Sequence, residues 1–247
     1  TAAQRRVAEE IGHDLARDRP MLRLIQGDVG CGKTIVAALA AARAVGSGRQ
    51  VAIMAPTELL AEQHAENFTR WFTALKQPVA LLTGRLAARA RRELLAAIAS
   101  GAVPIVVGTH ALFQEGVEFA RLALAVIDEQ HRFGVEQRRR LSAKGARDER
   151  RAHQLIMTAT PIPRTLAMTA YADLDVSVID ELPPGRTPVK TVALPESRRA
   201  EVIERIEQAC VAGRQVYWVC PLIEESETIE QQAAEEVAAQ LAAGLPG

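Results

Sequence analysis

The chain has 247 residues, of which 48% are hydrophobic and 24% charged, values ordinary for a soluble globular protein with room for one large domain and part of another. Basic and acidic residues number 30 each, so the net charge is zero and does not indicate a nucleic-acid partner. No stretch approaches the roughly 18 uninterrupted apolar residues of a membrane span, and nothing indicates a secretory leader. The three cysteines, Cys31, Cys210 and Cys220, form no metal spacing or disulfide framework, which suits a reducing cytoplasm.

Apolar runs of strand length alternate with segments of helical periodicity. The expected strands are residues 22–26, 50–55, 79–83, 105–107, 122–127, 153–157, 175–179, 189–194 and 215–220. Three helices are marked by apolar spacing: Ala61, Ala65, Phe68, Phe72 and Leu75; Leu86, Ala90, Leu94 and Ile98; Val202, Ile203, Ile206 and Cys210. Several strands lack polar alternation, as parallel strands covered on both faces do. The order predicts an α/β fold whose parallel sheet has helices on both faces.

The first motif is residues 27–34, GDVGCGKT, which fits G-x-x-x-x-G-K-[ST] between an expected strand and an expected helix. Its glycines let the backbone curl so that N–H groups face phosphate oxygens, and the helix N-terminus adds partial positive charge. We expect Lys33 to reach the β- and γ-phosphates and the Thr34 hydroxyl to bind Mg²⁺. The predicted phosphate-binding residues are Gly27, Asp28, Val29, Gly30, Cys31, Gly32, Lys33 and Thr34.

The second motif is residues 122–131, LALAVIDEQH, an apolar strand that ends in two carboxylates. Ligands of open parallel sheets bind at this end of the strands. Asp128 is expected to hold Mg²⁺, usually through water, and Glu129 to orient and deprotonate the attacking water. An acidic pair at a strand end is common by itself, but beside a phosphate loop it indicates nucleotide hydrolysis. A kinase, a transporter ATPase and a helicase all remain compatible with these two motifs.

A proline-rich break, ELPPGRTP, occupies residues 181–188 after the long α/β run. We expect a first domain at 1–183 and the start of a second at 184–247, with strands, the helix around Val202 and a last helix at 229–243. The chain starts with TAA rather than methionine and ends in LPG directly after a helical pattern. These features suggest a piece of a longer protein whose second α/β domain is incomplete.

The order of several motifs along the chain resembles that of superfamily 2 helicases. The matching segments are an upstream adenine-reading glutamine (Gln4), motif Ia (residues 55–64, APTELLAEQH), motif Ib (107–112, VGTHAL), the DExH box (128–131, DEQH) and motif III (157–164, MTATPIPR). Residues 171–186 and 219–226 resemble the RecG-type helicases in particular. Transcription-repair coupling translocases are the nearest alternative, but they usually carry an acidic residue where Gln130 stands.

The resemblance implies a RecA-like P-loop NTPase domain that uses ATP and Mg²⁺. It implies an enzyme, an ATP hydrolase driving a DNA helicase or translocase that remodels replication forks and Holliday junctions in recombination and repair. The implied partners are double-stranded and branched DNA, with no membrane, for a monomeric motor; a single-strand-binding protein partner stays open. His131 is expected to couple nucleotide state to the second domain through Thr158 or Thr160.

Candidate DNA contacts follow the ends of expected strands, where short hydroxyls and backbone amides can hold phosphates. They are Thr57, Thr83, Gly84, Arg85, Thr109 and His110. Helix capping or turn formation explains each threonine about as well. The basic runs at 89–92 and 138–140 are more typical of solvated helix faces, and His13, His64 and His153 are interpreted as structural.

Two further expectations follow from the resemblance. Such motors hydrolyse ATP between two RecA-like domains, the second of which supplies an arginine, and no glycine-flanked arginine pair follows residue 226. The chain alone is therefore expected to turn ATP over poorly. The competing class is an ATP-dependent switch that binds a protein partner without moving on DNA, and its turnover should not respond to DNA.

Overall fold

The computed structural model describes residues 1–114, 116–129, 151–160, 174–181, 185–187, 189–219, 237–239 and 241–242. The chain divides into two compact units, Thr1–Arg186 and Thr187–Gly247. None of the helices in the described ranges has the length and apolar character needed to cross a membrane.

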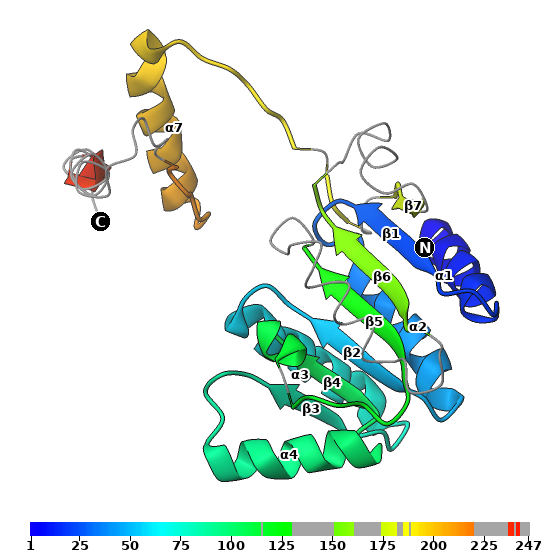
Figure 1. Cartoon of the computed structure of the whole chain (residues 1–247). Helices are drawn as coiled ribbons and strands as arrows, with labels where there is room; N and C mark the ends of the chain where they lie inside the picture. The colour runs from blue at the N-terminus through cyan, green and yellow to red at the C-terminus, as the bar shows by residue number, and fades with distance from the viewer. Residues whose placement is uncertain are drawn as a thin grey trace. The chain divides into compact units, whose positions relative to one another are not determined.

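The first unit is built on a seven-stranded sheet in which every pair of neighbours is parallel (Figure 1). The strands are β1 (Leu22–Gly27), β2 (Gln50–Met54), β3 (Val79–Leu82), β4 (Ile105–Gly108), β5 (Leu122–Asp128), β6 (His153–Thr158) and β7 (Asp175–Ile179), in the spatial order β3-β4-β2-β5-β6-β1-β7. Each lies within one residue of its predicted bounds. The predicted α/β class and parallel sheet are confirmed.

Helices cover both faces of this sheet, also as predicted. The described helices of this unit are α1 (Ala2–Leu15), α2 (Lys33–Gly46), α3 (Glu58–Thr73), α4 (Ala88–Ser100) and a short 3₁₀ turn, η1 (His110–Phe113). One core joins α1, α2 and α3 to one face, and a second core joins α4 and η1 to the other. Consecutive β1 residues show the alternation, since Leu24 lies in the second core and Ile25 in the first.

Helix α1 was not predicted from the sequence, although its signals are present. The Thr1 side chain accepts from the Gln4 N–H, and the Gln4 side chain reciprocates at the cap, which makes a capping box. Ala3, Val7 and Ile11 then repeat at helical spacing and are buried against the sheet. The apolar face is narrow and the residues between these three positions are mostly charged or polar, so the helical periodicity was not recognised.

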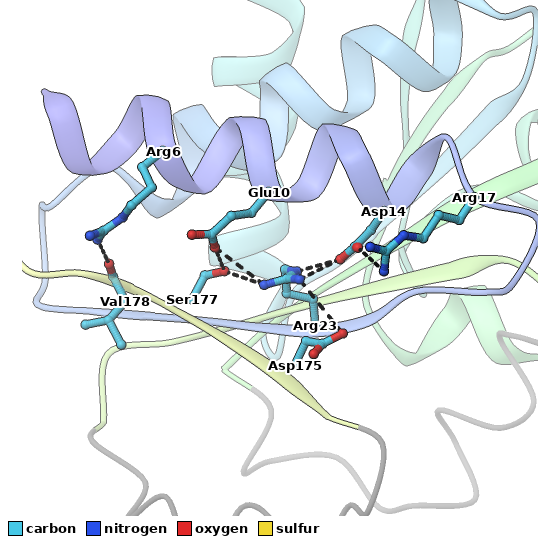
Figure 2. A network of polar contacts seen from close by, with 8 residues as sticks. All are labelled: Arg6, Glu10, Asp14, Arg17, Arg23, Asp175, Ser177 and Val178. Atoms are coloured by element: carbon cyan, nitrogen blue, oxygen red, sulfur yellow. Dashed lines mark hydrogen bonds and ion pairs between the residues drawn. The ribbon is translucent and has the colours of Figure 1, made fainter.

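A polar network fastens α1 to β1 and to the edge strand β7 (Figure 2). Arg23 on β1 donates to Asp14 Oδ2 at 2.8 Å and to Ser177 Oγ at 2.7 Å. Ser177 donates in turn to Glu10, and Arg6 donates to the Val178 carbonyl at 2.8 Å. The side chains of Arg23 and Asp14 are only 12% and 6% exposed, so this ion pair is largely shielded from water.

The second unit carries η4 (Glu196–Arg198) and α7 (Arg199–Val211), the latter as predicted. The expected strands at 189–194 and 215–220 were wrong, because the described residues of both segments are irregular. A strand is stable only beside a paired neighbour, and none of the unit's described residues pairs with them. None of its described side chains is buried either; the Arg199 guanidinium lies over the Trp218 ring at 5.0 Å.

Candidate functional site

The candidate residues gather at the carboxyl ends of the parallel strands. Strand register places Thr158 opposite Gln26, and Asp128 opposite Met157. Strand β6 lies between β1, which leads into residues 27–34, and β5, which ends at Asp128. Neighbouring strands lie about 4.8 Å apart, so the phosphate loop and Asp128 are separated by roughly 10 Å. One phosphate chain with its cation can bridge that gap.

The loop between β1 and α2 has the curled shape that phosphate binding needs. Gly30 and Gly32 adopt left-handed φ values of 81° and 92°. The Lys33 ammonium donates to the carbonyls of Gly27 at 2.7 Å and Asp28 at 3.0 Å, which holds its charge across the loop. A Cβ on Gly32 would lie 2.2 Å from Gln4 Nε2, so a larger residue would displace one or the other.

Gln4 lies against this loop because α1 places it there. Its side-chain N–H donates to the Cys31 carbonyl at 2.8 Å, while its Oε1 accepts from the chain's amino terminus at 2.8 Å. The Cys31 side chain itself is buried, and its contact with Gln4 is made through the backbone. The residue expected to read the base is thus bonded to the backbone of the phosphate loop.

The acidic pair at the end of β5 has two different environments. Asp128 Oδ2 is 2.8 Å from the imidazole Nε2 of His64, and the two side chains are 15% and 9% exposed. Glu129 has a left-handed φ of 50°, held by its N–H bond to the Met157 carbonyl at 3.0 Å. Its Oε1 accepts from the Ala159 N–H at 3.4 Å. Glu129 therefore touches the segment expected to couple nucleotide state to motion.

His64 was interpreted from sequence as structural, but it contacts a predicted metal ligand. The signal was its place in the buried face of α3, where Ala61, Phe68 and Phe72 are its neighbours and it is the only polar member. Nothing in the local pattern shows that this face reaches a strand end 64 residues further along the chain.

Of the expected coupling residues, Thr158 and Thr160 can be described and His131 lies outside the described residues. Thr158 is buried at the end of β6, and its hydroxyl oxygen accepts from the Thr160 N–H at 3.1 Å. The two threonines therefore form a local turn beside the Glu129 contact.

The candidate DNA contacts lie beyond β2, β3 and β4, along the same sheet edge. Thr57 caps α3 by accepting from the Leu60 N–H at 3.3 Å, so its capping role is real. The exposed Arg85 pairs with Glu58 at 2.7 Å. Thr83 and Thr109 are buried, Gly84 is open around its Cα, and His110 is exposed. The Thr109 hydroxyl has no hydrogen-bond partner within the described part of the chain.

Arg186 is a further loop contact that the sequence did not indicate. Its Nη1 donates to the Val29 carbonyl and lies 3.3 Å from Asp28 Oδ2. The residue belongs to the proline-rich break, which composition marks only as a boundary, so its return to residues 28–29 could not be foreseen.

Oxygen donors at this edge match the chemistry of Mg²⁺. The Thr34 hydroxyl starts α2 and the Asp128 carboxylate ends β5, and a glycine cradle lies beside them. The described residues contain no group of three or more histidine, cysteine or acidic side chains that could hold a metal. Mg²⁺ is usually bound by one or two carboxylates together with water and substrate phosphates, so this sparse donor set fits.

Comparison with known proteins gives a consistent result. The family profile of DEAD/DEAH box helicases matches residues 1–169. The chain is 63% identical over all 247 residues to the ATP-dependent DNA helicase RecG of Escherichia coli K12, and 61% to that of Haemophilus influenzae, in each case covering 36% of the relative. It thus spans about a third of the length of these curated relatives.

Solved structures agree in fold. A structure of RecG bound to a three-way DNA junction matches 96% of the chain and 31% of that protein, with 41% identity and a TM-score of 0.80. The Pyrococcus furiosus Hef helicase domain matches 93% of the chain and 53% of that protein, with 23% identity and a TM-score of 0.51, a likeness of fold alone.

Proposed function

The chain belongs to the DEAD/DEAH box helicase family, and from this premise we propose that it is the ATP-binding motor part of a RecG-type DNA helicase. The observation that carries the proposal is the meeting of residues 27–34 with Asp128 and Glu129 at one edge of a RecA-like sheet. High identity to RecG proteins along the whole chain supports the same assignment.

In this proposal the loop and the acidic pair divide the work of ATP hydrolysis. Backbone N–H groups of residues 27–34 and the Lys33 ammonium hold the β- and γ-phosphates. The Glu129 carboxylate takes a proton from a water whose oxygen bonds to the γ-phosphorus, while the bond from that phosphorus to the bridging oxygen of ADP breaks. Thr34 and Asp128 would hold Mg²⁺, which neutralises phosphate charge when bound.

The proposed substrate of the whole protein is branched double-stranded DNA. A RecG protein matched over 96% of this chain has been captured on a three-way DNA junction, and the DNA candidates here share the sheet edge of the nucleotide residues. Contacts to phosphates from strand ends and helix starts position nucleic acid without reading its sequence. A role in recombination and repair follows from that substrate class.

Steady-state ATP turnover tests this proposal in the full-length protein that contains the chain. Turnover is measured without DNA, with linear duplex and with a three-way junction. We expect the junction to stimulate turnover most, because a branched-DNA motor couples its ATP cycle to that substrate. Turnover that is indifferent to all DNA would favour an ATP-dependent protein switch and contradict the proposal. Stimulation that requires RNA polymerase would favour a transcription-repair coupling translocase.

A further inference from the structure

His64 connects a helix to the carboxylate at the end of β5. An ionised carboxylate only accepts hydrogen bonds, so the 2.8 Å contact requires His64 Nε2 to carry the proton and donate it to Asp128 Oδ2. Both side chains are largely shielded from water, where such a bond is stronger than at the surface. Asp128 Oδ1 makes no hydrogen bond to the described residues. Within the described residues, the carboxylate is therefore held through one oxygen.

The position of the imidazole is set by α3. On the same face, Ala61, Phe68 and Phe72 are almost fully buried in the core that packs on the sheet. The rings of Phe68 and Phe72 stack at a centroid separation of 5.8 Å, which further restrains the helix. The backbone that carries His64 is thus held by neighbours in the core, so a shift of this helix would carry the imidazole with it.

The start of α3 carries one candidate DNA contact and forms an ion pair with a second. Thr57 is its N-cap, and Glu58 in its first turn pairs with Arg85. The seven steps along the chain from the N-cap Thr57 to His64 correspond to about 10 Å along the helix axis, or two turns. One rigid element thus runs from the candidate DNA contacts to the Asp128 carboxylate.

We propose that His64 is a positioning residue: it orients Asp128 for Mg²⁺ and links the metal site to the N-terminal end of α3. The inference rests on the proposed function, in which Asp128 helps to hold the Mg²⁺ of bound ATP. Hydrogen-bond partners of metal ligands orient those ligands, and their loss typically lowers metal affinity or activity about 10- to 100-fold. A shift at the start of α3 on contact with DNA would reach Asp128 through this hydrogen bond.

Replacement of His64 in the full-length protein tests the proposal. In H64L the donor is lost while the volume is filled, whereas in H64Q an amide N–H can still reach Asp128. The first readout is the Mg²⁺ concentration for half-maximal binding of a fluorescent ATP analogue; the second is the ratio of junction-stimulated to basal ATP turnover. We expect H64L to raise the Mg²⁺ requirement about 10- to 100-fold and to lower the ratio, with H64Q close to the unmodified protein.

His153 supplies the matched control. It is a half-buried histidine at the opposite end of the strands, where its Nδ1 accepts from the Met21 N–H at 3.0 Å. Burial lowers the pKa of His153, with a partial opposing effect from Asp14, which agrees with its role as an acceptor, whereas His64 is a donor. H153Q should leave both readouts unchanged.

In H64N the amide is too short to reach Asp128, so this variant replaces H64L should the leucine protein fail to fold.

The D128N variant distinguishes the role of His64 from the assignment of Asp128 as an Mg²⁺ ligand. A raised Mg²⁺ requirement in D128N but not in H64L would overturn the role of His64 alone. An unchanged requirement in D128N would overturn the Mg²⁺ assignment and the inference with it. A defect of H64L that H64Q shares would show that the hydrogen bond to Asp128 is not what the imidazole contributes, and would overturn the proposal. An unchanged stimulation ratio in H64L would overturn the link to α3.

Discussion

At the scale of single residues, the proposed function gives the charged groups of the site separate tasks. Lys33 is fixed by two backbone carbonyls of its own loop, so its ammonium is already placed where phosphate oxygens are expected. Glu129 instead contacts the N–H of Ala159 and lies at the end of another strand. One group is suited to bind nucleotide and the other to act on the attacking water.

This division predicts different defects for two substitutions in the full-length protein. K33A should lower ATP turnover about 10²- to 10³-fold and weaken nucleotide binding, because it removes charge from the phosphates. E129Q should lower turnover about 10²- to 10⁴-fold but leave binding largely intact, because binding needs no base. Turnover and equilibrium binding of a fluorescent ATP analogue give the two values. R89A, on the exposed face of α4 and outside the site, is the control. A loss of affinity in E129Q as severe as in K33A would contradict these roles.

The positions of candidate residues were predictable where they form a short pattern and not where they depend on contacts between distant segments. The structure places residues 27–34 between β1 and α2, and Asp128 and Glu129 at the end of β5, as expected from local properties, while their roles remain a proposal. His64 and Arg186 were missed because their bonds join positions far apart in the chain. Thr57 shows a third case, since the cap considered as its alternative role is present and a DNA contact remains a proposal.

At the scale of elements, the most consequential link is between α1 and the strands beneath it. The strands were predicted well because buried parallel strands are continuous apolar runs. Helix α1 escaped prediction because its stability depends on a thin apolar face, on an ion pair with β1 and on hydrogen bonds with β7 that no local pattern reveals. The same helix places Gln4 against the phosphate loop, so the network around Arg23 also helps to position this residue.

The network predicts a large loss of stability on removal of its central side chain. R23A removes the shielded partner of Asp14, whose side chain is 6% exposed, and leaves it only the more exposed Arg17, 3.2 Å away. Breaking a buried ion pair lowers the free energy of unfolding by about 3–5 kcal/mol, and with Arg17 retained we expect a loss towards the lower end of that range. Urea unfolding of the chain, followed by circular dichroism, measures this change.

The control for that measurement is R89A. Arg89 pairs with Glu93 on the exposed face of α4, where the two side chains are 85% and 64% exposed. Such surface pairs contribute at most about 1 kcal/mol. Equal losses for R23A and R89A would show that the shielded network contributes no more than a surface pair.

At the scale of the whole molecule, the two units differ in how much of a domain each contains. The first has a seven-stranded sheet with two cores, whereas the described residues of the second include one long helix, no strand and no buried side chain. A nucleotide site shared between two RecA-like domains needs a second packed surface. The expectation of paired strands in the second unit failed because a strand pattern forms a strand only beside a partner.

Slow ATP turnover is therefore predicted for the 247-residue chain by itself. A second domain that supplies an arginine contributes about 10³- to 10⁵-fold in related phosphoryl transfer, and the chain should lack most of that contribution. Its turnover, with and without a three-way junction, is compared with that of the full-length E. coli relative under the same conditions. Junction-stimulated turnover near the rate of that relative would mean that all catalytic groups lie within these residues.

Glu129 also bears on how this protein responds to selection for stability. A residue other than glycine in the left-handed region costs about 1–2 kcal/mol, so the backbone at position 129, with φ at 50°, stores strain. Glycine would relieve it and would also delete the proposed base. Selection for heat resistance alone would then favour a more stable but inactive protein. A library screened in that way should therefore keep glutamate at position 129. At position 129, stability and activity therefore favour different residues.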